Sequence, residues 1–136
     1  MQIQRYFTQA GKDPLEGITF QPRTSRITKL DGSVVFEAKD VMVPDTWSQV
    51  AVDILAQKYF RRKGCEFDFE GSIYHHRYAA SFASQVPQRE GAQGEFDARQ
   101  VFHRLAGCWT HWGEQHGYFD TPADAQAFYD LSLIHI

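Results

Sequence analysis

The stretch between residues 46 and 62 constrains the fold most, because its apolar residues recur at the spacing of one helix face. We expect a helix from Thr46 to Arg62, capped by Asp45 or Thr46, with Gln49 at the capping-box position. Basic residues gather in its last turn, where they suit the helix dipole, and Gly64 can end it. The predicted apolar face consists of Trp47, Val50, Ala51, Ile54, Leu55 and Tyr59.

A β-hairpin signal precedes this helix. Two short runs of strand-forming residues flank Asp31–Gly32, a pair that favours the two-residue type I′ turn. We expect the hairpin near Thr24–Glu37, after an irregular segment, residues 1–22, that Gly and Pro punctuate. Strands this short are not stable by themselves, so the hairpin must pack on other elements.

Two further helices are predicted in the second half of the chain. The first spans about Phe96–Gln115 and has Gly117 behind it as a natural end. The second spans about Pro122–Asp130, with proline at its first position and Asp124 in capping-box reach of Thr121. The first of these helices has a broad apolar face of Ala98, Val101, Phe102, Leu105, Ala106, Trp109 and Trp112.

The predicted fold class is α+β: an N-terminal β-hairpin followed by about three amphipathic helices, mostly helical overall. Residues 1–64 carry the hairpin and the first helix, and residues 95–130 carry the second and third helices. Residues 65–94, rich in Gly, Ser, Gln and Ala, are interpreted as a variable loop or insertion and as the least ordered part. A chain of 136 residues permits one domain, or part of one.

The last six residues, 131–136, read LSLIHI. This hexapeptide is one reading frame of a transposon-end adapter used in sequencing libraries. We therefore expect that the natural sequence stops at Asp130 in mid-helix and that residues 131–136 are adapter translation. The alternative is a natural apolar helix end, and sequencing the source gene with trimmed reads distinguishes the two.

Composition excludes several classes of function. A net charge of −3 argues against nucleic acid as the main partner, because phosphate binding needs a basic face. No apolar run of about 18 residues occurs, so no membrane span is predicted. The N-terminus lacks the apolar core of a signal peptide, and two cysteines make no disulfide framework. These features predict a cytoplasmic protein.

A basic run is the first candidate binding site. Lys58, Arg61, Arg62 and Lys63 could bind phosphate, but a solvated helix end that completes the helix dipole is the favoured interpretation. The glycines at positions 91 and 94 are too close together for a dinucleotide fingerprint.

His103, His111 and His116, with Cys108 among them, suggest zinc. However, His111 and His116 are five residues apart and cannot share a helix face, so no metal site is predicted. We interpret the histidines as polar and interfacial, and Cys108 as a small buried packing residue. No nucleophilic or acid–base arrangement can be assigned, so no catalytic residue is predicted.

Four stretches carry a family resemblance: RYFTQAGKDP, FQPRTSRI, DGSVVFEAKDVMVPDTWSQVAVDILAQKYFRR and VFHRLAGCWTHWGEQHGYFDTPADAQAFYD. They resemble the N-terminal part of adenosylcobalamin-dependent (class II, vitamin B12-dependent) ribonucleotide reductases. The resemblance covers about Ile3–Arg62 and Glu95–Asp130, and residues 65–94 are the least family-like part.

The resemblance implies a large enzyme that converts ribonucleotides, with diphosphates suggested, to deoxyribonucleotides. It implies adenosylcobalamin-initiated thiyl radical chemistry on a barrel, with a thiol reductant such as thioredoxin as partner. That chemistry needs at least three barrel cysteines, and this chain has only Cys65 and Cys108, neither in such a motif. No catalytic residue can be transferred to this sequence, and its cofactor-binding residues are unknown.

The implied role of this chain is structural, with the helices packed on a barrel that lies outside it. Trp47, Val50, Ile54, Trp109 and Trp112 would form the contact, and the isolated chain would expose them and be inactive. Two competing interpretations remain open at this point. One is an independent small nucleotide- or phosphate-binding module acting through the basic end at residues 61–63, and the other is a metal-binding regulatory domain.

Overall fold

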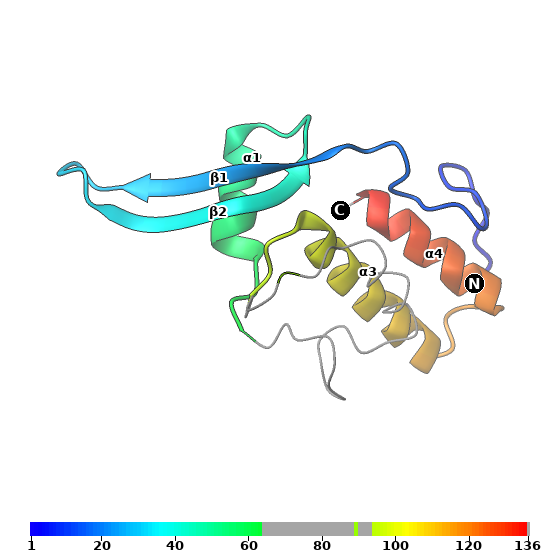
Figure 1. The fold of residues 1–136 in the computed structure, drawn as a ribbon. Coiled ribbons are helices and arrows are strands. Elements are labelled where there is room, and N and C mark those ends of the chain that lie inside the picture. Colours follow the sequence, from blue (N-terminus) through cyan, green and yellow to red (C-terminus); the bar gives the residue numbers. More distant parts are fainter. Residues whose placement is uncertain (64–88, 90–93, 136) are drawn as a thin grey trace.

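The structure, a computed structural model, describes residues 1–63, 89 and 94–135. Within these residues the chain is α+β, as predicted: one two-stranded antiparallel sheet and helices packed at one end of it (Figure 1). In chain order the elements are β1 (Phe20–Thr28), β2 (Val34–Pro44), α1 (Gln49–Ile54), the π-helical turn η1 (Leu55–Tyr59), α3 (Ala98–Gln115) and α4 (Pro122–His135).

The hairpin is longer than predicted, and its turn differs. The paired strands run from Phe20 opposite Pro44 to Thr28 opposite Val34. The type I′ prediction is wrong, because Gly32 has a φ of 83° whereas Asp31 does not have a positive φ. The Lys29 N–H donates to the Ser33 carbonyl over 2.8 Å, which closes a three-residue loop that needs only one left-handed residue.

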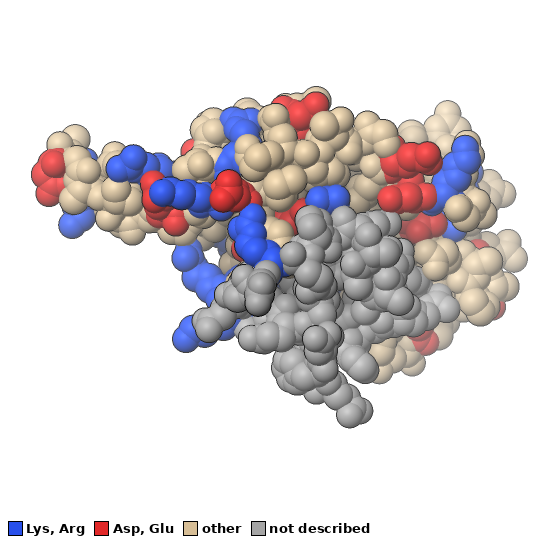
Figure 2. Space-filling model, in the orientation of Figure 1, with Lys and Arg blue, Asp and Glu red and all other residues tan. Residues whose placement is uncertain are grey.

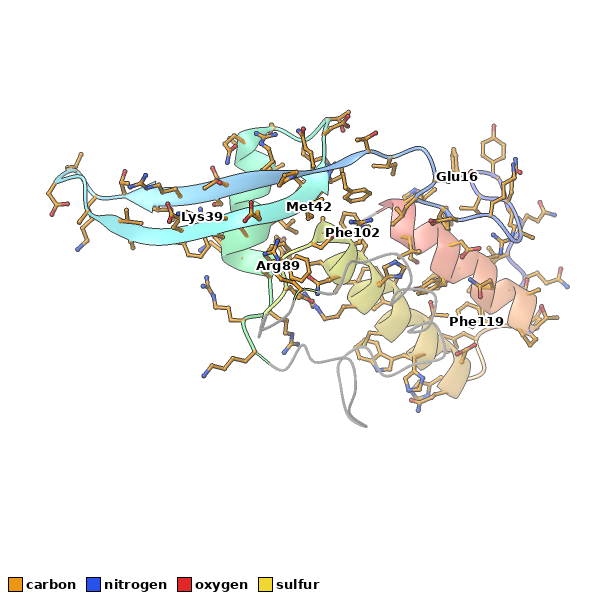
Figure 3. The ribbon with its side chains drawn as sticks, in the orientation of Figure 1. Glu16, Lys39, Met42, Arg89, Phe102 and Phe119 are labelled. Atoms are coloured by element: carbon orange, nitrogen blue, oxygen red, sulfur yellow. The ribbon has the colours of Figure 1, made fainter. Side chains whose placement is uncertain are left out.

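The core lies where the C-terminal half of β2 meets the helices. Val41 and Val43 of β2 are buried against residues of α1, α3 and α4. A further backbone contact joins these layers, because the Met42 N–H donates to the Phe96 carbonyl over 2.8 Å. Figure 3 labels Met42 and Phe102 where β2 passes the start of α3. The hairpin therefore packs on the helices, as expected.

The first helix begins later and ends earlier than predicted. Its N-cap is Ser48, whose hydroxyl accepts from the Ala51 N–H over 3.3 Å, so the expected caps Asp45 and Thr46 are wrong. The helix then widens into the π turn η1 and stops at Tyr59 instead of Arg62. Val52, Leu55 and Ala56, at helical spacings of three and four residues, form the buried face, whereas Val50 and Ile54 are exposed.

α3 matches its predicted span and is continuous through both of its glycines. It ends with the expected Gly117, which has a φ of 66°. The Tyr118 N–H donates to the Gly113 carbonyl over 2.8 Å, and the Gly117 N–H donates to the Glu114 carbonyl over 3.2 Å. These two bonds form a Schellman motif, which satisfies carbonyls at the helix end.

α4 confirms its predicted start and extends past its predicted end. The Thr121 hydroxyl accepts from the Asp124 N–H, and Asp124 accepts from the Thr121 N–H over 3.0 Å, as in a capping box. The helix continues beyond Asp130 to His135, and Leu133 is buried in the core. The adapter origin of residues 131–136 stays a prediction.

The predicted loop, residues 65–94, lies outside the described residues apart from Arg89 and Gly94. The division into residues 1–64, 65–94 and 95–130 therefore stays a prediction. Within residues 1–63 and 94–135, none of the helices combines the length and the apolar character needed to cross a membrane.

Candidate functional site

An apolar groove of about 360 Å³ lies between α1 and η1 on one side and α3 on the other. The ring of Trp47 packs against the ring of Phe102, with centroids 6.0 Å apart. The lining side chains end in carbon, except for Trp47 and Tyr59, so the groove suits an apolar occupant. It is lined by Trp47, Ala51, Ile54, Leu55, Tyr59, Val101, Phe102 and Leu105.

The apolar surface continues along α3 beyond the groove. Leu105, Trp109 and Trp112 follow at spacings of four and three residues, so they share one helix face. Trp109 is 42% exposed and Trp112 is 55% exposed. We call the groove together with Trp109 and Trp112 the apolar face. The expected exposure of Ile54, Trp109 and Trp112 is confirmed, whereas Trp47 is half-buried.

A buried ion pair fixes the geometry of the groove. The Glu95 side chain is fully buried and accepts from Arg104 Nε over 2.8 Å and from the Arg61 N–H over 2.7 Å. Arg104 also donates to the Tyr59 carbonyl over 3.0 Å. Since Arg104 belongs to α3 and Tyr59 ends η1, these bonds hold the two walls of the groove together.

A second polar cluster starts α3. Asp97 is the N-cap, and its carboxylate accepts from the Arg99 N–H over 2.9 Å and pairs with the Arg99 guanidinium over 2.7 Å. Gln100 completes a capping box by accepting from the Asp97 N–H over 2.9 Å. The Arg99 guanidinium also lies 4.3 Å from the centre of the Phe20 ring, which links α3 to β1. These polar groups position α3 and are engaged in packing.

The basic run is engaged in structure. The Arg62 guanidinium lies over the Phe36 ring, 5.1 Å from its centroid, and the Arg61 N–H donates to Glu95. Lys58 lies exposed in the last turn of η1. On the face that Figure 2 shows, blue and red side chains alternate along the hairpin. In the hairpin, Glu37 pairs with both Arg26 and Lys39. Because η1 stops at Tyr59, only Lys58 lies in the last turn, and the predicted placement of Arg61, Arg62 and Lys63 in that turn is wrong.

The predicted histidine group does not converge. His103 is fully buried and hydrogen-bonds through Nδ1 to the hydroxyl of Tyr129 on α4, whereas His111 is exposed. His116 packs near the Tyr118 ring, with centroids 6.1 Å apart. In the part of the chain that the structure describes, no three His, Cys, Asp or Glu side chains form a group that could hold a metal ion. Cys108 is a free thiol and is only half-buried, so the prediction of a buried residue is wrong.

The N-terminal segment is fastened to α4. The Ile3 N–H donates to Asp124 over 2.8 Å, and the Arg5 guanidinium pairs with Asp130 over 2.6 Å. Hydrogen bonds from the Thr121 hydroxyl and then from the Ile3 N–H hold the pKa of Asp124 below its usual value. Sequence reasoning missed these long-range pairs, and also the Glu95–Arg104 pair, because no local spacing marks their partners.

Comparison with known proteins gives a consistent result. The family model described as "Class II vitamin B12-dependent ribonucleotide reductase" matches residues 21–135. The chain is 46% identical to the vitamin B12-dependent ribonucleotide reductase of Bradyrhizobium diazoefficiens, over 96% of this chain and 11% of the relative. It is 42% identical, with the same coverage, to the enzyme of that name from Agrobacterium fabrum.

A more distant relative agrees with these two. The vitamin B12-dependent ribonucleotide reductase of Rhodopirellula baltica is 29% identical over 93% of this chain and 10% of the relative. The chain thus spans about a tenth of the length of the curated relatives it matches. Because the family model covers most of the chain, the chain belongs to the class II vitamin B12-dependent ribonucleotide reductase family and corresponds to its N-terminal part.

Proposed function

We propose that this chain is the N-terminal structural part of an enzyme that reduces ribonucleotides to deoxyribonucleotides and so supplies DNA precursors. The observation that carries the proposal is the match of residues 21–135 to the family, joined to 46% identity with a named reductase. The family resemblance suggests ribonucleoside diphosphates as substrates and a thiol such as thioredoxin as reductant. The enzyme is proposed to act in the cytoplasm.

The arrangement of polar groups supports a structural role. The buried carboxylates of Glu95, Asp97 and Asp130 are each paired with an arginine. The buried His103 is bonded to Tyr129. These pairings hold α3, α4 and the segments next to them in place. They therefore support a structural role for the chain.

Adenosylcobalamin is the proposed cofactor of the parent enzyme, where it supplies radical initiation when bound. The apolar groove does not fit it. The groove is about 360 Å³, smaller than many sites for drug-sized ligands, and its walls are mainly carbon. A corrin edged with amide side chains needs a larger site with many hydrogen-bonding partners. We therefore assign no cofactor contact to the described residues.

The proposal is tested by activity. The full-length gene should give a protein that reduces ribonucleotides with dithiothreitol only when adenosylcobalamin is added, and a cytidine diphosphate substrate should outperform the triphosphate. The 136-residue chain should give no product, because its only cysteines are Cys65 and Cys108.

Two results would contradict the proposal in different ways. A full-length protein without cobalamin-dependent turnover would remove the reductase activity. Turnover by the 136-residue chain alone would remove the structural role. A preference for triphosphates would change only the substrate assignment.

A further inference from the structure

Residues 1–10, which we call the strap, lie beside α4 and form neither helix nor strand. Figure 1 shows this blue segment next to α4. The Ile3 N–H donates to Asp124 Oδ1 over 2.8 Å. The Arg5 guanidinium pairs with Asp130 Oδ2 over 2.6 Å. Two carboxylates of α4 therefore anchor the strap.

Each of these carboxylates is divided between α4 and the strap. Asp124 accepts from the Thr121 N–H through its other oxygen, Oδ2, over 3.0 Å, in the capping box that begins α4. Asp130 accepts from Gln126 Nε2 through its other oxygen, Oδ1, over 2.8 Å. Both of these bonds lie within α4 and its cap, so they stay in place if the strap leaves. α4 thus keeps a hydrogen bond to each carboxylate with or without the strap.

The strap adds little to the core. None of residues 1–10 is fully buried, and Tyr6 and Phe7 are 88% and 67% exposed. The first buried residue of the chain is Leu15, which is 6% exposed. Segments that bury few apolar side chains open locally at a lower free energy than the whole fold. The strap meets this condition, whereas Leu15 fastens the chain that follows it.

A hinge lies between the strap and Leu15. Gly11 has a φ of 77° and open space where a Cβ would stand. Glycine adopts many backbone conformations at little steric cost. A cavity of about 430 Å³ lies between residues 11–14 and the C-terminal half of α4. The chain therefore has both the residue and the room to turn at Gly11.

We propose that the strap is a releasable element, which opens about Gly11 as one unit while β2, α3 and α4 stay folded. Its two anchors are only two residues apart, and Arg5 also donates to the Thr8 hydroxyl over 3.0 Å within the strap. Loss of one anchor therefore weakens the other. Release frees one oxygen of each anchoring carboxylate, so the open and closed states differ in the negative charge that α4 presents to other groups.

Hydrogen exchange of the full-length protein tests this proposal. Mass spectrometry with electron-transfer fragmentation resolves the Ile3 amide, which is bonded to Asp124, from the amides of residues 101–106 inside α3. In the unmodified protein, and after correction for intrinsic rates, the Ile3 amide should exchange at least about a hundredfold faster than those of α3.

Two variants test whether the anchors act together. Arg5→Ala and Asp130→Asn each weaken the ion pair, and neither changes the partners of the Ile3 N–H. Each should speed exchange at Ile3 by about tenfold and leave residues 101–106 unchanged. The matched control is Lys12→Ala, which removes an exposed cation just beyond the hinge and should change the Ile3 rate by less than about twofold.

Four results would overturn the proposal. An unchanged Ile3 rate in either variant would show that the anchors open independently. Equal acceleration at residues 101–106 would show that the ion pair holds the whole fold. An equal effect of Lys12→Ala would show that the loss of any nearby charge suffices. Exchange at Ile3 as slow as in α3 in the unmodified protein would show that the strap opens only with global unfolding.

Discussion

Valine occurs in both halves of β2, but it is exposed in one half and buried in the other. Val34 and Val35, near the hairpin loop, are 46% and 58% exposed, whereas Val41 and Val43 are 1% and 0% exposed. We call residues 26–37, the part of the hairpin that extends past the helices in Figure 1, the arm, and residues 40–63 with 94–135 the body. The comparison teaches that one residue type forms strand in both halves, whereas its burial depends on whether helices lie opposite the strand.

The largest expected effect sharpens this comparison at valine. Val43→Asp places an unpaired charge in the core and should lower the free energy of unfolding by on the order of 4 kcal/mol. Val35→Asp, in the arm, should change it by less than about 0.5 kcal/mol. Urea titration of the chain followed by circular dichroism measures both. Equal losses would show that the arm is packed as tightly as the body.

Ion pairs in the body should contribute more to stability than ion pairs in the arm. Glu95→Ala leaves Arg104 without its buried partner and should cost about 3 kcal/mol. Glu37→Ala removes pairs between partly exposed side chains and should cost less than about 1 kcal/mol. The same urea titrations measure the two losses, and high salt should weaken only the Glu37 contribution. A Glu37 loss as large as that of Glu95 would contradict the comparison.

Two glycines test the comparison with smaller changes. A Cβ at Gly113 would lie 2.5 Å from Phe119 Cε2, so Gly113→Ala should cost about 2 kcal/mol through displacement of that ring. Gly32 in the arm has a φ of 83° and open space around it, so Gly32→Ala should cost about 1 kcal/mol through backbone strain alone. Thermal unfolding midpoints rank the two, and Phe119→Leu should relieve only the Gly113→Ala loss.

Acid should remove the stability contributed by one carboxylate in each region, Asp31 in the arm and Asp124 in the body. Hydrogen bonds from the Ser33 hydroxyl and N–H lower the pKa of Asp31, and the bonds from Thr121 and Ile3 lower that of Asp124, both from an ordinary value of 3.8. A lowered folded-state pKa adds stability that is present above the unfolded pKa and is lost as the pH falls through the folded value. We expect stability from these groups to decline only below about pH 4.

Unfolding midpoints between pH 2 and 6 measure this decline. Asp31→Asn and Asp124→Asn should each flatten the acid limb, and only Asp124→Asn should also loosen the N-terminal segment, which hydrogen exchange at Ile3 detects. An unchanged acid limb in both variants would contradict the pKa assignment.

Local signals in the sequence predicted local structure well. The Thr121–Asp124 capping box and the Gly117 helix end are confirmed, because each depends on residues within one helical turn. The first helix start was predicted too early, since the Trp47 N–H donates to the Pro44 carbonyl and forms a turn there. Ser48 then becomes the first residue free to cap.

The spacing of apolar residues in the sequence did not predict which polar side chains are buried. His103 and Thr110 lie on the buried side of α3, although the predicted apolar face of this helix does not include them. Their burial depends on partners: Tyr129 on α4 for the imidazole, and the Ala106 carbonyl for the Thr110 hydroxyl, over 2.7 Å. The apolar face was predicted from its residue types, but the groove itself depends on how α3 crosses η1.

The π turn η1 determines how the protein responds to the deletion of one residue. A π turn holds one residue more than the α-helical turn it replaces, and its wide bond runs from the Phe60 N–H to the Leu55 carbonyl. Loss of a single codon within Leu55–Tyr59 would replace the wide turn by an ordinary helical turn, so the residues after it would keep their direction around the helix axis, whereas a deletion within α1 would rotate them by about 100°. The Arg61 N–H would then still face Glu95, so we expect the groove to survive a deletion of one residue in η1 and to open after a deletion of one residue in α1.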